Sequence, residues 1–574
     1  MEIKGTELFV KALKEEGVEK LFAYPGGMAI DLFDAIYDVD DFEVILPRHE
    51  QALIHAADGY ARATGNVGVC LVTSGPGATN LVTGIATANY DSVPLVCFTG
   101  QVMTSLIGND AFQEVDIVGI ARNICKYAVT VRKREDLGRI IKEAFYIART
   151  GKPGPVLVDI PKDIQNEMGT DVYPETVNIR GYKPSTGVHA GQIKKVMKLM
   201  DQAKKPVFLV GGGVKISNAG EELTQLVEKT GIPVMTTIMG KGAIDTNHPL
   251  YIGNIGMHGN FASNNAVNNC DLLISIGTRF NDRITGRLSE FAKDATIVHI
   301  DIDPASISRN IVVDVPIVAD AKAAMEAMLP HAKKYKISDW VADIQKWKED
   351  HPINMNNYEG MTPEKIIKKI NEIFPELIVS TDVGQNQLWS TQYLELGPKK
   401  KLLTSGGLGT MGYGFPAAIG AKLGTEGIPV ICISGDGGVQ MNIQEMATAV
   451  VMELPVILCV FNNGYLGNVR QWQEMFYDKR YSYTCLRCRR SCSHRCMDAE
   501  QECPPYSPDF VKLAESYDAV GIRVEKEEDI EPAFRKAMER VNGPTLIEFI
   551  IEREANVLPM VPGGKALHEM IMDC

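Results

Sequence analysis

Two short polar motifs in the C-terminal third of the sequence contain the residue types best suited to chemistry. One follows the apolar run VICIS and consists of Gly435, Asp436, Gly437 and Gly438. The other follows the apolar run VILCVF and is Asn462-Asn463. Asp436 and the Asn463 amide both offer hard oxygen ligands for Mg²⁺. The motifs therefore predict a Mg²⁺ and diphosphate site, whereas the alternative is two ordinary turns that close strands.

The segment after Gly438, residues 439–451, is predicted to be helical. A helix start presents free backbone N–H groups, and glycines there leave room for phosphate oxygens to approach. This element would therefore add diphosphate contacts to the two metal ligands.

Strand-like and helix-length segments alternate along the whole chain. Runs such as 69–73, 156–160, 272–277 and 430–438 are apolar on both faces, which predicts parallel strands covered by helices. Ligands of such sheets bind beyond the carboxyl ends of the strands. We therefore expect an α/β fold with three doubly wound parallel-sheet domains.

Two polar, turn-rich stretches, 173–187 and 351–363, have the composition of linkers. A chain of 574 residues is too long for one hydrophobic core. We expect domains at 1–172, 188–345 and 360–550, followed by a C-terminal tail at 551–574.

Glu50 is a candidate acid in the first of these domains. It opens a helical segment downstream of the turn Tyr24-Pro25-Gly26-Gly27. A glutamate at a helix start is favoured by the helix dipole alone, so the position also has a purely structural interpretation. The nearby His49 and His55 are expected to make local hydrogen bonds.

These motifs together resemble the acetolactate synthases, a family of thiamine-diphosphate enzymes. The resemblance covers nearly the whole chain and is carried by segments 71–102, 104–120, 154–165, 406–424, 468–482 and 558–564. It implies a pyrimidine-binding first domain, a central FAD-type domain and a diphosphate-binding third domain.

The resemblance also implies how thiamine diphosphate would be held. Asp436, Asn463 and the main-chain carbonyl of Tyr465 would bind Mg²⁺. The remaining cofactor contacts would come from Pro25, Gly26, Gln385, Asn386, Gly409, Met411, Gly435, Gly437 and Gly438. Asn386 departs from the family pattern, because relatives often have a histidine there.

The substrate residues are likewise implied by the resemblance. Glu50 would activate the cofactor, and the Gly27 backbone and Gln113 would lie near the reacting carbonyl. Three further side chains would contact the acceptor, namely Phe112, Arg283 and Trp472, and Lys162 would line the entrance. The structural alternatives are a surface ion pair for Arg283, a core position for Trp472 and an exposed, solubilising role for Lys162.

Gly-rich strand ends and later acids in the middle domain suit a dinucleotide, although no clean GxGxxG is present. By resemblance these segments would bind FAD, which would be structural because the reaction has no net redox change. The implied contacts are Gly211, Gly212, Thr236, Met257, His258, Gly277, Arg279, Asn281, Asp301, Asp303 and Asp320.

Charge and composition indicate which kinds of molecule this protein is expected to contact. A formal net charge of -13 argues against a nucleic-acid surface. We found neither a membrane-length apolar run nor the apolar core of a signal peptide, and expect a cytoplasmic protein. The resemblance implies a homodimer or homotetramer, with a possible separate regulatory small subunit.

Five of the 12 cysteines crowd between Cys485 and Cys503, where the family usually has a short connection. They are Cys485, Cys488, Cys492, Cys496 and Cys503. With His494 they could bind zinc or an iron–sulfur cluster, respond to oxidants, or form an inert loop.

The resemblance implies that the chain decarboxylates pyruvate and condenses the hydroxyethyl unit with pyruvate or 2-ketobutyrate, the first common step of branched-chain amino acid biosynthesis. The rival activities are a simple 2-ketoacid decarboxylase and a glyoxylate carboligase. Glu50 argues against the carboligase, which lacks the activating glutamate. A non-catalytic relic of the fold is a third alternative, which the intact Asp436 and Asn463 oppose.

Overall fold

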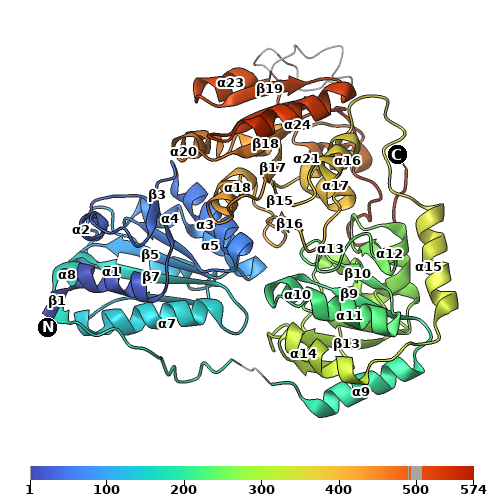
Figure 1. Cartoon of the computed structure of the whole chain (residues 1–574), viewed down its shortest axis with the longest axis horizontal. Coiled ribbons are helices and arrows are strands. Elements are labelled where there is room, and N and C mark those ends of the chain that lie inside the picture. Colours follow the sequence, from blue (N-terminus) through green and yellow to red (C-terminus); the bar gives the residue numbers. More distant parts are fainter. Residues whose placement is uncertain (1, 185–186, 489, 491, 493–506, 574) are drawn as a thin grey trace.

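The computed structural model of the chain describes residues 2–184, 187–488, 490, 492 and 507–573. Three six-stranded sheets, each with helices packed against it, dominate this part of the chain (Figure 1). Every strand pair in the three sheets is parallel. The predicted fold class is therefore confirmed. Each sheet lies inside one of the predicted domains, whose boundaries stay a prediction.

The N-terminal sheet has the order β3-β2-β4-β5-β7-β6. Its strands are β2 (Lys20–Ala23), β3 (Glu43–Ile45), β4 (Gly68–Val72), β5 (Leu95–Gln101), β6 (Tyr127–Thr130) and β7 (Pro155–Pro161). The helices around it are α1 (Gly5–Glu15), α2 (Ile30–Ile36), α3 (Glu50–Thr64), α4 (Pro76–Thr79), α5 (Val82–Asp91), α6 (Ile117–Ala121), α7 (Leu137–Arg149) and α8 (Lys162–Asn166). A small antiparallel pair, β1 (Glu2–Lys4) and β8 (Met168–Thr170), ties the start of this domain to its end.

The middle sheet has the order β11-β10-β9-β12-β13-β14. Its strands are β9 (Pro206–Val210), β10 (Val234–Thr236), β11 (Tyr251–Asn254), β12 (Leu272–Ile276), β13 (Thr296–Asp301) and β14 (Val315–Val318). Its helices are α9 (Ala190–Gln202), α10 (Gly212–Ile216), α11 (Gly220–Thr230), α12 (Phe261–Asn269), α13 (Asp282–Thr285), α14 (Ala321–Met328) and α15 (Ser338–Asp350).

The C-terminal sheet has the order β16-β15-β17-β18-β20-β19. Its strands are β15 (Leu377–Thr381), β16 (Lys400–Leu403), β17 (Val430–Gly435), β18 (Val456–Asn462), β19 (Val520–Val524) and β20 (Thr545–Ile550). Its helices are α16 (Pro363–Ile373), α17 (Gln385–Tyr393), α18 (Gly414–Leu423), α19 (Asp436–Val439), α20 (Met446–Val451), α21 (Gly467–Phe476), α23 (Phe510–Ser516) and α24 (Ile530–Glu539).

Short 3₁₀ turns connect several of these elements. They are η1 (Thr104–Leu106), η2 (Arg134–Asp136), η3 (Leu288–Glu290), η4 (Leu329–His331), η5 (Ile443–Glu445) and η6 (Glu527–Asp529).

Helix α3 of the N-terminal domain packs directly against α18 of the C-terminal domain (Figure 1). Glycines permit the close approach: a Cβ at Gly59 would lie 2.1 Å from the Ala417 carbonyl oxygen, and one at Gly420 would lie 1.8 Å from the Ala56 oxygen. This contact fixes the helix that begins at Glu50 against the domain that contains Asp436.

Two histidines near the start of α3 differ in their contacts. His49 caps the helix, its Nδ1 accepting from the Gln51 N–H at 3.0 Å, as predicted. The prediction for His55 was wrong, because neither buried ring nitrogen has a hydrogen-bond partner in the described chain. Its ring packs edge-on against Tyr413, and burial lowers its pKa to about 4. His55 therefore acts as a neutral aromatic core residue.

Candidate active site

Asp436 lies at the carboxyl end of β17 and is 2% exposed. Its Oδ2 accepts from the Gly464 N–H at 3.1 Å, while its buried Oδ1 has no hydrogen-bond partner in the part of the chain that the structure describes. Burial raises the pKa of Asp436 to about 7, opposed by backbone N–H groups and Arg487. A buried carboxylate oxygen without a protein partner suits a cation ligand.

Asn463 reaches the same place from the neighbouring strand. Strand β18 pairs with β17 up to the position of Gly435, so the residues that follow both strands lie side by side. The Asn463 Oδ1 accepts from the Tyr465 N–H at 3.0 Å, and its Nδ2 donates to the Gln385 Oε1 at 3.4 Å. All three implied Mg²⁺ ligands therefore lie in two adjacent strand-end turns.

The helix predicted over 439–451 is broken. Helix α19 ends at Val439, and η5 and α20 follow as separate short pieces. The break includes Asn442, whose backbone has φ -136° and ψ 33° and whose side-chain Nδ2 donates to the Gly412 carbonyl at 2.8 Å. This bond ties the segment to the loop that contains Met411.

The other predicted diphosphate contacts gather around the same turn. Asn386 is buried and donates to the Asp382 and Ile433 carbonyls, both at 3.0 Å. The Met411 Cε lies 3.9 Å from where a Cβ at Gly437 would be. Gly409 has φ +75°, a conformation that favours glycine.

Asp382 was missed by sequence reasoning, although it follows a strand and directly precedes the segment Val383-Gly384-Gln385-Asn386. It is buried and accepts from the N–H groups of Val383 at 2.9 Å, Gly412 at 3.0 Å and Gly414 at 3.1 Å. An acid at a strand end before a glycine was the available signal. Asp382 holds the Met411 loop against the end of β15.

The N-terminal half of the predicted site centres on Glu50. Its Oε2 accepts from the Asn80 Nδ2 at 2.9 Å. The preceding Arg48 N–H donates to the Glu445 Oε1 of the C-terminal domain at 3.0 Å. Glu445, which sequence reasoning also missed, therefore fixes the chain just before Glu50. The contacts recorded for the Glu50 carboxylate lie within its own domain.

The Tyr-Pro-Gly-Gly turn contacts two other predicted residues. Lys162 donates to the Gly27 carbonyl at 3.1 Å and pairs with Asp31 at 3.2 Å. A Cβ at Gly26, which follows Pro25, would lie 2.5 Å from the Thr73 Cβ, so this position requires glycine. Lys162 is therefore tied to the turn rather than free in solvent.

Gln113 and Phe112 lie on a surface loop. Gln113 has φ +58° and its backbone packs against Gly75, which follows the strand β4. The Phe112 side chain is 82% exposed in the single chain. The Phe112 ring is therefore open to solvent in the single chain.

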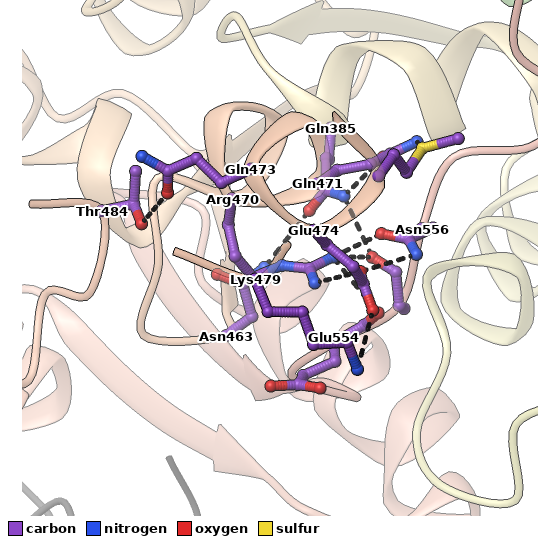
Figure 2. A network of polar contacts seen from close by, with 12 residues as sticks. Gln385, Asn463, Arg470, Gln471, Gln473, Glu474, Lys479, Thr484, Glu554 and Asn556 are labelled. Carbon is purple, nitrogen blue, oxygen red and sulfur yellow. Dashed lines mark hydrogen bonds and ion pairs between the residues drawn. The ribbon is translucent and has the colours of Figure 1, made fainter. Parts of the chain in front are cut away.

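Helix α21 contains Trp472 and is held by a polar network (Figure 2). The buried Arg470 bonds Glu474 at 2.6 Å and the Asn556 Oδ1 at 2.5 Å. Gln471 exchanges two hydrogen bonds with the Val557 backbone, at 2.9 and 3.0 Å. Trp472 is only half-buried, so it is not a fully enclosed core residue.

A cavity of about 300 Å³ opens at the carboxyl ends of the middle strands. Predicted FAD contacts that line it are Gly212, Gly277, Arg279, Asn281, Asp301 and Asp320, and Arg283 lines it as well. Lys152 also lines it and pairs with Asp303 at 3.3 Å, a contribution from the N-terminal domain that sequence reasoning missed. Burial raises the pKa of Asp301 to about 6.

Other predicted FAD contacts do not line this cavity. Gly211 packs against the end of β12, where a Cβ would lie 2.2 Å from the Gly277 oxygen. The Thr236 hydroxyl bonds Asn254 at 2.9 Å. Met257 contacts the Arg283 guanidinium through its sulfur at 3.6 Å, and His258 lines a separate cavity. Their cofactor roles stay predictions.

Arg283 itself is 58% exposed and forms a long ion pair with Asp282 at 3.7 Å. This pair matches the structural alternative for the residue, while its place on the cavity wall leaves the guanidinium accessible to a carboxylate. Both interpretations therefore stay open.

The described part of the cysteine-rich segment contains Cys485, Cys488 and Cys492. Within the described residues, no group of three or more histidine, cysteine or acidic side chains is arranged to hold a metal ion. Cys496, Cys503 and His494 lie outside the described residues. Among the described residues, none of the helices is long and apolar enough to cross a bilayer.

The chain matches all three domains of the thiamine pyrophosphate enzymes. The N-terminal TPP binding domain matches residues 3–120, the central domain 193–328 and the C-terminal TPP binding domain 382–549. The fold and the strand-end site therefore define a thiamine-pyrophosphate-dependent enzyme.

Similarity to curated proteins shows which family of thiamine pyrophosphate enzymes the chain resembles. The probable acetolactate synthase large subunits of Methanococcus aeolicus and Methanocaldococcus jannaschii are each 46% identical, over 99% of this chain and 95% of theirs. The acetolactate synthase isozyme 3 large subunit of Escherichia coli is 42% identical, over 99% of this chain and 98% of its own. The chain belongs to the acetolactate synthase large-subunit family.

Proposed function

We propose that this chain decarboxylates pyruvate and joins the resulting two-carbon unit to a second 2-ketoacid, either pyruvate or 2-ketobutyrate. This is the first common step of branched-chain amino acid biosynthesis. The observation that carries the proposal is the buried Asp436 Oδ1, which has no partner among the described residues and lies beside Asn463. Membership of the family supports the choice of reaction.

Bound thiamine diphosphate supplies the electron sink that lets a 2-ketoacid lose CO₂. Asp436, Asn463 and the Tyr465 carbonyl would bind the Mg²⁺ that anchors the diphosphate. Met411 would support the cofactor from the loop that Asp382 holds in place. The residues present fit this cofactor, because two strand ends supply hard oxygen ligands and Gly437 and Gly438 leave the turn unobstructed.

Glu50 would exchange a proton with the aminopyrimidine of the cofactor. Its Oε2 accepts from Asn80, so Oε1 is the oxygen available for this exchange. Gln113 and the Gly27 backbone would orient the substrate carbonyl, and Lys162, bonded to Gly27, would stabilise that turn. Arg283 would pair with the acceptor carboxylate, with Trp472 and Phe112 forming the pocket wall.

FAD is the cofactor we propose for the middle-domain cavity. Asp301 and Asp320 would accept hydrogen bonds from ribose hydroxyls. Arg279 and Lys152 would pair with the negatively charged diphosphate of the FAD. The flavin would be structural, since the reaction involves no net oxidation.

We further propose a cytoplasmic homodimer or homotetramer with a separate small subunit. The Glu50 carboxylate bonds Asn80 of its own domain, and Phe112 is exposed, as expected if a second copy completes the site. The relatives are named large subunits, which supports a separate regulatory partner. Nine described cysteines form no disulfide, which suits a reducing compartment.

The test is product formation from pyruvate with thiamine diphosphate, Mg²⁺ and FAD, omitting each addition in turn. We expect acetolactate, with loss of activity when any addition is left out of fully stripped protein. Acetaldehyde as the only product would replace the proposal with a simple decarboxylase. Acetolactate formed without flavin would overturn the FAD assignment alone.

A further inference from the structure

The segment 484–488 lies across the loop that contains two of the predicted Mg²⁺ ligands, Asn463 and Tyr465. We call it the strap. The Thr484 carbonyl accepts from the Leu466 N–H at 2.8 Å, and the Leu486 N–H donates to the Gly464 carbonyl at 2.8 Å. These two bonds flank Tyr465, which is bridged to Cys485. The strap therefore determines where the Tyr465 carbonyl is held.

Side chains of the strap contact the same site. The Leu486 Cδ1 lies 3.4 Å from the Cβ position of Gly437, and the Arg487 Nε lies 2.8 Å from that of Gly464. Arg487 is also one of the charges acting on Asp436. On its other side the strap contacts α21, where the Thr484 hydroxyl donates to the Gln473 Oε1 at 2.7 Å (Figure 2). A movement of the strap would therefore shift both the loop that contains two of the predicted Mg²⁺ ligands and helix α21, which contains Trp472.

Three thiols meet at the end of the strap. The sulfur atoms of Cys488 and Cys492 are 3.9 Å apart, and Cys488 also contacts the Cys485 thiol. All three side chains are partly buried. Two cysteine sulfurs at this separation need only a local shift to reach the bonded distance of about 2 Å.

We propose that Cys488 and Cys492 form a reversible disulfide, and that this oxidation weakens retention of Mg²⁺ and thiamine diphosphate through the strap. The inference rests on the proposed cofactor site. The oxidant is a low-molecular-weight disulfide, such as oxidised glutathione. Drawing the two sulfurs together displaces Cys488, and the strap bonds to Gly464 and Leu466 lengthen or break.

The exchange has two balanced steps. The Cys492 thiolate attacks one sulfur of the small disulfide and expels a thiolate, leaving a mixed disulfide. Cys488 then attacks the Cys492 sulfur and expels the second small thiolate; the two expelled thiolates take up the two cysteine protons.

Cys488 is suited to react second. Burial, followed by the neighbouring Cys485 and Cys492, raises the pKa of its thiol to about 12. Formation of the mixed disulfide at Cys492 removes one of those neighbouring groups. Cys488 then becomes easier to ionise at the stage when its attack is needed.

The test uses the reduced holoenzyme, equilibrated with oxidised and reduced glutathione at fixed ratios. Mass spectrometry of the digested protein should show loss of two hydrogens and a link between the peptides of Cys488 and Cys492. Retention of thiamine diphosphate is then measured after rapid gel filtration. We expect the oxidised protein to release it roughly tenfold faster, the size expected from loss of one or two hydrogen bonds.

Matched variants complete the test. Oxidised Cys488→Ala and Cys492→Ala should keep the release rate of the reduced protein, whereas Cys125→Ala, a partly buried cysteine in another domain, should respond like the wild type. A link between a different pair, no link at any ratio, or a link with unchanged release would each overturn the inference. Neither readout uses turnover, so failure of the proposed reaction would be seen separately, as reduced protein that binds thiamine diphosphate without forming acetolactate.

Discussion

At the scale of single residues, the buried Asp436 carboxylate is the main support for the proposed Mg²⁺ site. A carboxylate that is 2% exposed is costly to keep charged without compensation. The Gly464 N–H donates to Oδ2, whereas Oδ1 has no partner among the described residues. The Asp436 Oδ1 is therefore available as a metal ligand, close to the end of the strand that is followed by Asn463.

Glu50→Gln is the first prediction at this scale. A glutamine cannot donate and recover the proton as the carboxyl does, so kcat should fall by about 10²- to 10⁴-fold. Its amide oxygen can still accept from Asn80, so the melting temperature should stay near that of the wild type.

Steady-state acetolactate formation and thermal unfolding are the two measurements for this variant. Glu43→Gln, an exposed acid of the same domain, is the control and should leave kcat unchanged. Full activity in Glu50→Gln would remove Glu50 from the catalytic role and revive its interpretation as a helix-start residue.

Motif spacing singled out Asp436, Asn463 and Glu50, because each follows a recognisable strand or turn, and their cofactor roles stay predictions. Asp382 and Glu445 were not found in this way. Their partners, Gly412 and Arg48, are 30 and 397 positions away, so their role depends on tertiary contacts that local sequence does not record. Lys152 was missed for the same reason, since its partner Asp303 belongs to another domain.

At the scale of elements, the contact between α3 and α18 fixes the position of the N-terminal domain. Gly420→Ala would put a methyl group 1.8 Å from the Ala56 carbonyl oxygen. The helices must separate, which should cost about 1–3 kcal/mol of stability.

Thermal or urea unfolding would measure this loss, with Gly563→Ala as the control. A Cβ at Gly563 meets no atom within 4 Å, so this variant should unfold like the wild type. A Gly420→Ala protein as stable as Gly563→Ala would show that the two helices can part without cost.

Element types were easier to predict than element ends. Buried, β-branched runs identified the parallel strands because both faces of those strands are covered. The helix predicted over 439–451 failed, because helical periodicity does not reveal that the Asn442 side chain bonds the distant Gly412 carbonyl. The prediction for His55 failed similarly, since local sequence did not reveal that Tyr413 packs against its ring.

Across the whole molecule, a buried ionic network joins the N- and C-terminal domains. Arg62 contacts Asp58 at 2.6 Å, Asp91 at 3.0 Å and the Thr404 carbonyl at 3.0 Å. Arg62→Met leaves both acids without their cation and should cost about 3–5 kcal/mol.

Unfolding of Arg62→Met and of the double variant Arg62→Met/Asp91→Asn would measure this cost. The double variant should recover part of the loss, because one of the two uncompensated charges is gone. Equal stability of both variants would show that Asp91 does not depend on Arg62.

Lys241 links the middle domain to the C-terminal domain and gives the molecule a pH-dependent stability. It is buried, donates to the Thr391 carbonyl of α17, and burial lowers its pKa to about 7, opposed by Glu395. In the unfolded chain a lysine has a pKa of about 10.4. Between these values the unfolded state binds one more proton, so stability should rise with pH from about 7 to about 10.

Lys241→Met removes this titration while leaving the Thr391 carbonyl without its donor, a cost that does not change with pH. The melting temperature of the variant relative to the wild type should therefore be highest near pH 7 and fall steadily toward pH 10. Lys229→Met, at an exposed position of the same domain, is the control. Parallel curves for Lys241→Met and the wild type would mean that Lys241 stays charged in the folded protein, and that the contact with Thr391 compensates for its burial.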